Sequence, residues 1–180
     1  LNHALEGDAE SPGAHINLGL NYLKDGNVSM AIQEFNTVIK ADPTNELAYF
    51  NVGFAYYTLA VSLKGSGKES QAREAIEESN RAYQSALKLK PDYTEAAYNI
   101  GYNFQTIKDY TNAALWYQKT LEINATYAQA YFSLGTMNQL LGNNQEAAKA
   151  YCQLIKLNPS DLANEVNTVK ETVKSLGGCH

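Results

Sequence analysis

Apolar and small side chains recur along this chain at intervals of three and four residues, which is the spacing of one face of an α-helix. Short stretches with glycine, asparagine or proline interrupt the pattern and are typical of turns. The pattern predicts an all-α chain with helices at residues 13–24, 28–41, 45–63, 68–89, 93–106, 110–123, 127–140 and 144–157.

Pairs of an apolar residue and a glycine mark an internal repeat with spacings of 34, 48 and 34 residues: Leu18-Gly19, Val52-Gly53, Ile100-Gly101 and Leu134-Gly135. A small residue follows each glycine by 12 residues, or by 26 in the second repeat, and an aromatic residue comes four later: Ala31 and Phe35, Ser79 and Tyr83, Ala113 and Tyr117, Ala147 and Tyr151. Proline, which cannot continue a helix, ends the first, second and fourth repeats at Pro43, Pro91 and Pro159, and Ala125 stands at this place in the third.

This order of residues at a period of 34 resembles the tetratricopeptide repeat family. The resemblance extends over about residues 12–161 and is weakest at Ser79, Ala125 and Asn138. It implies an α-solenoid of about four helix-turn-helix units, at residues 12–45, 46–93, 94–127 and 128–161. Because glycine has no Cβ, we expect the aromatic residue of each unit to fill the space beside its glycine.

The two ends of the chain depart from the repeat. After the last unit comes an apolar stripe at helical spacing: Leu162, Val166, Val169, Val173 and Leu176. Residues 162–176 are therefore predicted to form a capping helix, and residues 177–180 a disordered tail. Residues 1–9 match residues 35–43 in register, so residues 1–11 are expected to be the end of an upstream repeat.

The second repeat carries fourteen additional residues. Divided evenly, they lengthen both of its helices by seven residues, or about 10 Å. The pair is predicted to protrude as a hairpin at residues 60–75. Its role is open between a finger that contacts a partner and growth that a loop tolerates.

Composition narrows the classes of partner. The chain has 14 Lys and Arg against 19 Asp and Glu, a net charge of −5. No basic cluster would neutralise a line of phosphates, so nucleic acid is not an expected partner. No apolar run is long enough to insert into a membrane as a helix. The sequence assigns no compartment.

Candidate residues for catalysis or metal binding are few. The histidines and cysteines lack the spacing of a metal site; Cys152 is expected to pack in its helix and Cys179 to lie in the tail. Residues 65–70 resemble a phosphate-binding loop only in part, because Ser62 and Glu69 stand where that loop has Gly and Ser or Thr. We expect no cofactor and no metal.

The resemblance implies that the first helix of each repeat lines a concave surface that binds peptides. Positions sharing this face are rich in aromatic residues, and a row of asparagines lies beside them. The candidate peptide-binding residues are Asn17, Leu20, Phe50, Asn51, Phe54, Tyr57, Tyr98, Asn99, Tyr102 and Phe132. The rings would anchor apolar side chains, and the amides would pair with an extended backbone. The alternative is that these rings and amides pack between helices.

The sequence thus predicts a non-enzymatic scaffold that binds a protein or peptide in an aromatic, asparagine-lined groove. Relatives that clamp a terminal carboxylate have Lys and Asn where this chain has Ile16 and Leu20, so that kind of ligand is disfavoured. One alternative is a structural module of a longer or self-assembling repeat array. An enzyme is the least favoured alternative.

Overall fold

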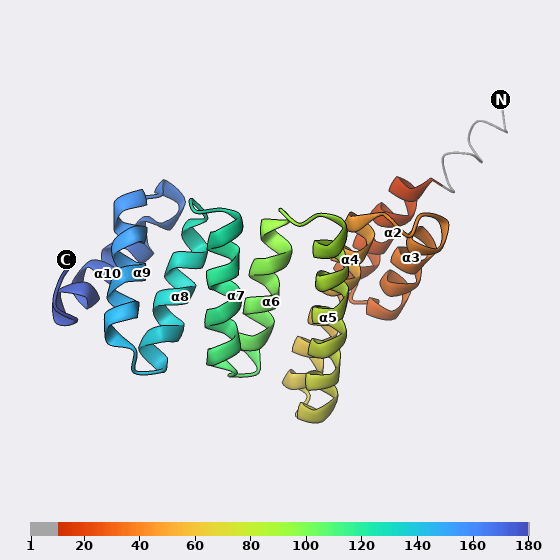
Figure 1. The fold of residues 1–180 in the computed structure, drawn as a ribbon. Helices are drawn as coiled ribbons and strands as arrows, with labels where there is room; N and C mark the ends of the chain where they lie inside the picture. Colours follow the sequence, from red (N-terminus) through yellow and green to blue (C-terminus); the bar gives the residue numbers. More distant parts are fainter. Residues whose placement is uncertain (1–10, 180) are drawn as a thin grey trace. The chain divides into compact units, whose positions relative to one another are not determined.

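The computed structural model describes residues 11–179, which form helical hairpins that follow one another along the chain (Figure 1). The helices are α2 (Pro12–Lys24), α3 (Val28–Ala41), α4 (Glu46–Gly65), α5 (Glu69–Leu89), α6 (Thr94–Thr106), α7 (Tyr110–Ile123), α8 (Ala128–Leu140), α9 (Asn144–Leu157) and α10 (Ala163–Ser175), with a 3-10 turn at Ser160–Leu162. Each predicted repeat helix agrees with the structure to within two residues at both ends, and the all-α prediction is confirmed.

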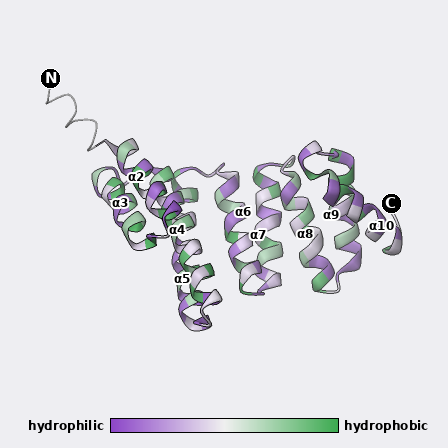
Figure 2. Ribbon diagram, turned by 180° about the vertical axis from the view of Figure 1, so that it is seen from behind, coloured by the Kyte–Doolittle hydropathy of each residue, from purple (hydrophilic) through white to green (hydrophobic). Residues whose placement is uncertain are grey.

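The chain divides into two compact halves between Ala96 and Ala97. In the N-terminal half, α2 packs against α3, α3 against α4, and α4 against α5. In the C-terminal half, α7 packs against α8, α8 against α9, and α9 against α10. Hydrophilic and hydrophobic residues lie side by side on these helices (Figure 2), as the apolar periodicity requires.

The repeat glycines allow the two helices of a hairpin to approach closely. A Cβ added at Gly53 would lie 2.7 Å from the ring of Tyr83, and one at Gly19 would lie 2.5 Å from the ring of Phe35. Both rings are buried. Ser79, which stands where other repeats have alanine, is also buried, and its hydroxyl donates to the carbonyl of Gly53 at 2.7 Å. The expected pairing of glycine with the aromatic residue is therefore confirmed.

The turn inside each repeat passes through a residue with positive φ. In three repeats this residue is glycine, with φ of 77° at Gly26, 73° at Gly67 and 78° at Gly142. The third repeat has Lys108 at the same place, with φ of 62°. A lysine in this region is strained because its Cβ crowds the backbone.

The second repeat is longer, as predicted. Helix α4 has 20 residues against 13 in α2, and α5 has 21 against 14 in α3, so each helix gains seven residues. Figure 1 shows the α4–α5 pair continuing past the ends of α2 and α3. Ala60, Ala72 and Ile76 are buried where the added turns meet, so the extension is packed rather than loose.

The capping helix is present, but the tail prediction is wrong. Val166, Val169 and Val173 of α10 are buried in one cluster with Tyr151 and Leu154 of α9. The residues after α10 turn back through two glycines with positive φ, and Cys179 forms a disulfide with Cys152 of α9. The expected upstream-repeat character of residues 1–11 falls almost wholly outside the described residues.

Candidate functional site

Helices α2 and α4, the first helices of repeats 1 and 2, present two equivalent apolar side chains to solvent. Leu20 follows Gly19 and Phe54 follows Gly53; they are 40% and 43% exposed. Asn17, three residues before Leu20, is also exposed. Leu20 and Phe54 are thus the most exposed apolar residues among the predicted contact residues of this half.

Phe50 lies one turn before Phe54 but is partly enclosed by the fold. Its ring stacks on Tyr93 with 4.9 Å between centroids and is tilted against Tyr83 at 5.3 Å. Such ring pairs add stability beyond simple burial. Phe50 is therefore engaged mainly in packing within the fold and offers less of its ring to a ligand than Phe54 does.

The asparagine row is not uniformly available to a ligand. The side chain of Asn51 is 6% exposed, and its Nδ2 donates to the carbonyl of Leu47 at 2.8 Å. This geometry favours the packing alternative for Asn51. Asn17, by contrast, is exposed, and Tyr57 is half-buried on the same helix as Asn51.

The sequence analysis named Phe54 but missed two exposed apolar residues on the same face of α4. Leu47, Phe54 and Val61 are 44%, 43% and 45% exposed. They lie seven residues apart and so share one face of the helix. No charged residue interrupts α4 between Glu46 and Lys64. The signal was present in the spacing, but only the structure shows which face of this apolar helix stays uncovered. We call Leu47, Phe54 and Val61 the α4 stripe.

Charge is sparse along this surface. The only Lys or Arg residues of α2 and α4 are Lys24 and Lys64, in the last turn of each helix. His15 of α2 lies with its Nδ1 2.6 Å from Oε2 of Glu34 on α3, so this imidazole is engaged within the hairpin. The α2–α4 surface offers no cluster of basic side chains to hold a ligand carboxylate.

In the C-terminal half, Tyr98 is a packing residue. Its hydroxyl lies 3.2 Å from Oγ of Ser133, and its ring contacts Tyr117 and Tyr127 with centroids 5.2 Å and 5.3 Å away. Burial raises the pKa of the Tyr98 hydroxyl, and the hydrogen bond with Ser133 opposes that shift. The aromatic cluster holds α6, α7 and the start of α8 together.

The other candidates of this half remain accessible to different degrees. Tyr102 is 40% exposed on α6, and Asn99 is half-buried on the same helix. Phe132 of α8 is half-buried, with its ring 6.4 Å from that of Tyr151. Tyr102 is thus the most accessible candidate ring of the C-terminal half.

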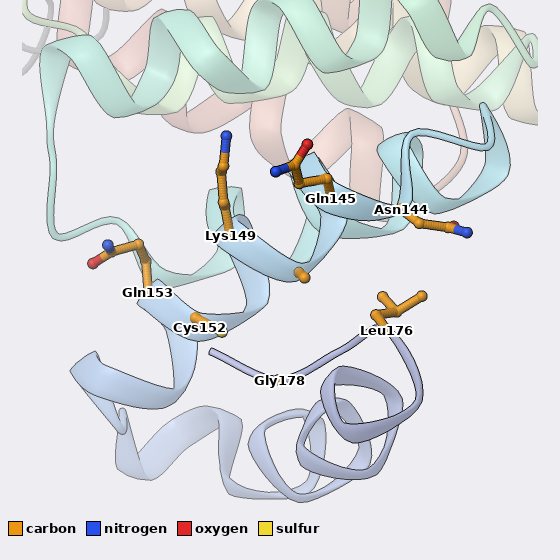
Figure 3. Close-up of a pocket in the computed structure, with 8 residues that line it drawn as sticks. Asn144, Gln145, Lys149, Cys152, Gln153, Leu176 and Gly178 are labelled. Carbon is orange, nitrogen blue, oxygen red and sulfur yellow. The ribbon is translucent and has the colours of Figure 1, made fainter. Parts of the chain in front are cut away.

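A pocket of about 470 Å³ lies between α9 and the end of the chain (Figure 3). Cys152, Leu176 and Gly178 form part of its wall. Lys149 also lines it, but the ammonium group is 2.7 Å from Oε1 of Glu146. The amide side chains around it present no arrangement that we recognise as a reaction centre.

Metal and phosphate chemistry find no support in the part of the chain that the structure describes. Among residues 11–179, no group of three or more His, Cys, Asp or Glu side chains could hold a metal ion. Residues 65–70 form the turn from α4 into α5, in place of the strand-to-helix turn of a phosphate loop. None of the helices in this part combines the length and hydrophobicity of a membrane span.

Three family models match the chain and together reach from residue 21 to residue 161. One, described as TPR repeat, matches residues 21–59. Two, described as tetratricopeptide repeat, match residues 57–128 and 128–161. A comparison with curated proteins found no match.

Several solved structures share the fold at low sequence identity. A thermophilic TPR protein from Thermus thermophilus is 20% identical, with 94% of this chain and 85% of its own covered and a TM-score of 0.71. MamA is 22% identical, with coverages of 87% and 84% and a TM-score of 0.70. The first TPR of Spaghetti (RPAP3), bound to the HSP90 peptide SRMEEVD, is 21% identical, with coverages of 74% and 95% and a TM-score of 0.60. These likenesses establish the repeat fold.

Proposed function

Because the chain belongs to the tetratricopeptide repeat family, we propose that it is a non-catalytic scaffold that binds a protein segment on the first helices of its repeats. The fold supports a protein-interaction role in general, and the related TPR of Spaghetti was solved with a peptide bound. The finer part of the proposal is which residues make the contact.

The observation that carries the proposal is the exposure of Leu20 and Phe54 on α2 and α4, two helices in contact with each other. Burying such a side chain from full exposure contributes roughly 1.5–3 kcal/mol, so covering the two fifths that remain exposed here contributes roughly 0.6–1.3 kcal/mol each. A few such residues usually supply most of the binding energy of an interface. The N-terminal half therefore has the means to hold an apolar ligand.

The proposed contact residues are those that are exposed or half-exposed on the first helices: Asn17, Leu20, Phe54, Tyr57, Asn99, Tyr102 and Phe132. The rings of Phe50 and Tyr98 and the amide of Asn51 support this surface from within the fold. The two halves are proposed as separate contact faces.

The proposed ligand differs from the acidic peptide SRMEEVD of the Spaghetti complex. Ile16 of this chain is buried, and Leu20 is an exposed aliphatic side chain. Neither could pair with a carboxylate, which would lose its hydration without compensation. We propose an apolar or aromatic segment that needs no terminal carboxylate.

A peptide-display selection on the immobilised chain tests this proposal. Enriched peptides should be rich in aromatic and aliphatic residues, and their affinity should change little between low and high salt, because the surface carries few charges. Enrichment of acidic C-terminal sequences, with affinity that falls steeply as salt is added, would place the contact surface elsewhere.

A second candidate, a structural module of a repeat array, is favoured by one observation. Leu18 before Gly19 is 40% exposed, whereas Val52, at the equivalent place before Gly53, is 7% exposed in a helix that packs against α3. The face of α2 around Leu18 is thus more exposed than the equivalent face of α4, as a surface that joins another repeat would be. Sedimentation over a range of concentrations tests for self-association; a monomer throughout, in both wild type and Leu18→Ser, would count against it.

A further inference from the structure

The α4 stripe lies on a helix with almost no polar interruption. Between Glu46 and Lys64 the helix carries no charge, and its other faces pack against α3 and α5. Leu47, Phe54 and Val61 nevertheless keep 43–45% of their surface exposed. A contiguous exposed apolar ridge of this kind marks an interaction site in soluble proteins.

The stripe has the spacing of a helix-to-helix seam. Phe50 and Tyr57 are half-buried along the same edge, so apolar positions follow one another at intervals of three and four residues from Leu47 to Val61. This is the interval that two helices use when they pack side by side with knobs in holes. The seam is about 21 Å long, or roughly four helical turns.

Two polar side chains beside the stripe use a donor within α4 itself. Nδ2 of Asn51 donates to the carbonyl of Leu47 at 2.8 Å, and the hydroxyl of Thr58 donates to the carbonyl of Phe54 at 2.9 Å. An extended peptide on this surface would find few donors on α4 for its own carbonyl groups. A helix satisfies its backbone groups internally, so it suits an apolar ridge.

The inserted residues complete the seam. Helix α2, without the insertion, has 13 residues, which is too short for three exposed positions seven residues apart. The seven residues added to α4 include Val61, the last member of the stripe. The insertion therefore lengthens a surface for a partner in addition to lengthening the hairpin.

We propose that the α4 stripe binds an amphipathic helix of about four turns, supplied by a partner protein, with uncharged apolar residues at intervals of three and four. This inference rests on the proposed function, because it names the form of ligand that the surface of α2 and α4 would take. It also replaces the extended ligand expected from the asparagine row in the N-terminal half.

Two synthetic peptides of identical composition test the form of the ligand. In one, leucines occupy positions 1, 4, 8, 11 and 15 of a fifteen-residue helix of Ala, Gln, Glu and Lys; in the other, the leucines are scrambled. Fluorescence anisotropy with the full chain should show at least tenfold tighter binding of the patterned peptide. Phe54→Ser and Val61→Ser should each weaken it about tenfold.

The control is Met30→Ser on α3, which removes a side chain of similar exposure, 42%, from outside the stripe and should leave binding unchanged.

Equal binding of the two peptides, or no binding of either, overturns the helical ligand. Wild-type affinity in Val61→Ser overturns the role of the insertion. A dimer of this chain that Val61→Ser dissociates assigns the stripe to a second copy and also overturns the proposal. If display-selected peptides still depend on Phe54 in these cases, the proposed function survives alone.

Discussion

Cys152 on α9 and Cys179 after α10 form a disulfide, with their Cα atoms 5.7 Å apart and a sequence separation of 27. Cys179 is exposed and Cys152 is half-buried. The bridge closes a loop that contains the whole capping helix. A cross-link of this length stabilises a fold by roughly 3.5 kcal/mol when it acts by restricting the unfolded chain.

We therefore expect a reducing agent to lower the thermal unfolding midpoint of the wild-type chain by several degrees. The double variant Cys152→Ser, Cys179→Ser should show the lower midpoint from the outset and no response to the reductant. The measurement is circular dichroism during heating. An identical midpoint for the oxidised wild type and the double variant would mean that the disulfide adds nothing to the cap.

Two glycines of α4 should respond in opposite ways to alanine. Gly53→Ala places a methyl group 2.7 Å from the ring of Tyr83, so we expect a loss of about 1–3 kcal/mol through overpacking. Gly65→Ala meets nothing within 4 Å and should gain up to about 1 kcal/mol from helix propensity. Urea denaturation gives both values. A Gly53→Ala variant as stable as the wild type would show that the hairpin is looser than described.

Lys108→Gly should stabilise the chain. The αL conformation costs a lysine roughly 1–2 kcal/mol, and the greater freedom of glycine in the unfolded state offsets up to about 1 kcal/mol. The net gain is expected to be about 0.5–1 kcal/mol by urea denaturation. The converse variant, Gly67→Lys, should lose a comparable amount, since Gly67 occupies the same place in its turn at φ 73°.

Stability should fall in alkaline solution because of Tyr98. Its pKa is raised above the ordinary value of about 10 in the folded chain, so the unfolded chain loses this proton first as the pH rises. The stabilisation is complete below about pH 10 and is lost as the pH rises through the folded-state pKa. Below pH 10, the urea midpoints of wild type and Tyr98→Phe should differ only by the contribution of the lost hydrogen bond to Ser133. Above pH 10, the urea midpoint of the variant should fall less than that of the wild type.

The fold could be predicted from the sequence because the residues that determine it are local and repeated. Gly53 and Tyr83, or Gly19 and Phe35, occupy the same places in successive repeats, and the turn glycines bound the helices within two residues. The disulfide could not be predicted from the sequence. Cys152 and Cys179 meet because two glycines turn the chain back after α10, and the spacing of the two cysteines in the sequence does not indicate this turn.

The candidate site could be predicted from the sequence only in part. The sequence identified Phe54 and Tyr102 as members of an aromatic face, but exposure depends on which neighbouring helix covers each residue. Asn51 is buried and bonded to its own helix, while Leu47 and Val61 are exposed on a helix that is apolar nearly all round. Periodicity cannot distinguish these cases when both faces of a helix are apolar.

The central claim is that the exposed side chains of α2 and α4 bind a partner segment. Calorimetric titration of a display-selected peptide into wild type, Leu20→Ala, Phe54→Ala and the control Leu115→Ala tests it most directly. Leu115 is 53% exposed on α7, the second helix of the third repeat. Leu20→Ala and Phe54→Ala should each weaken binding about three- to tenfold, in line with roughly 0.6–1.3 kcal/mol for the surface that each side chain still exposes. Circular dichroism should be unchanged, and Leu115→Ala should bind with wild-type affinity. Wild-type affinity in both the Leu20 and the Phe54 variants would contradict the account.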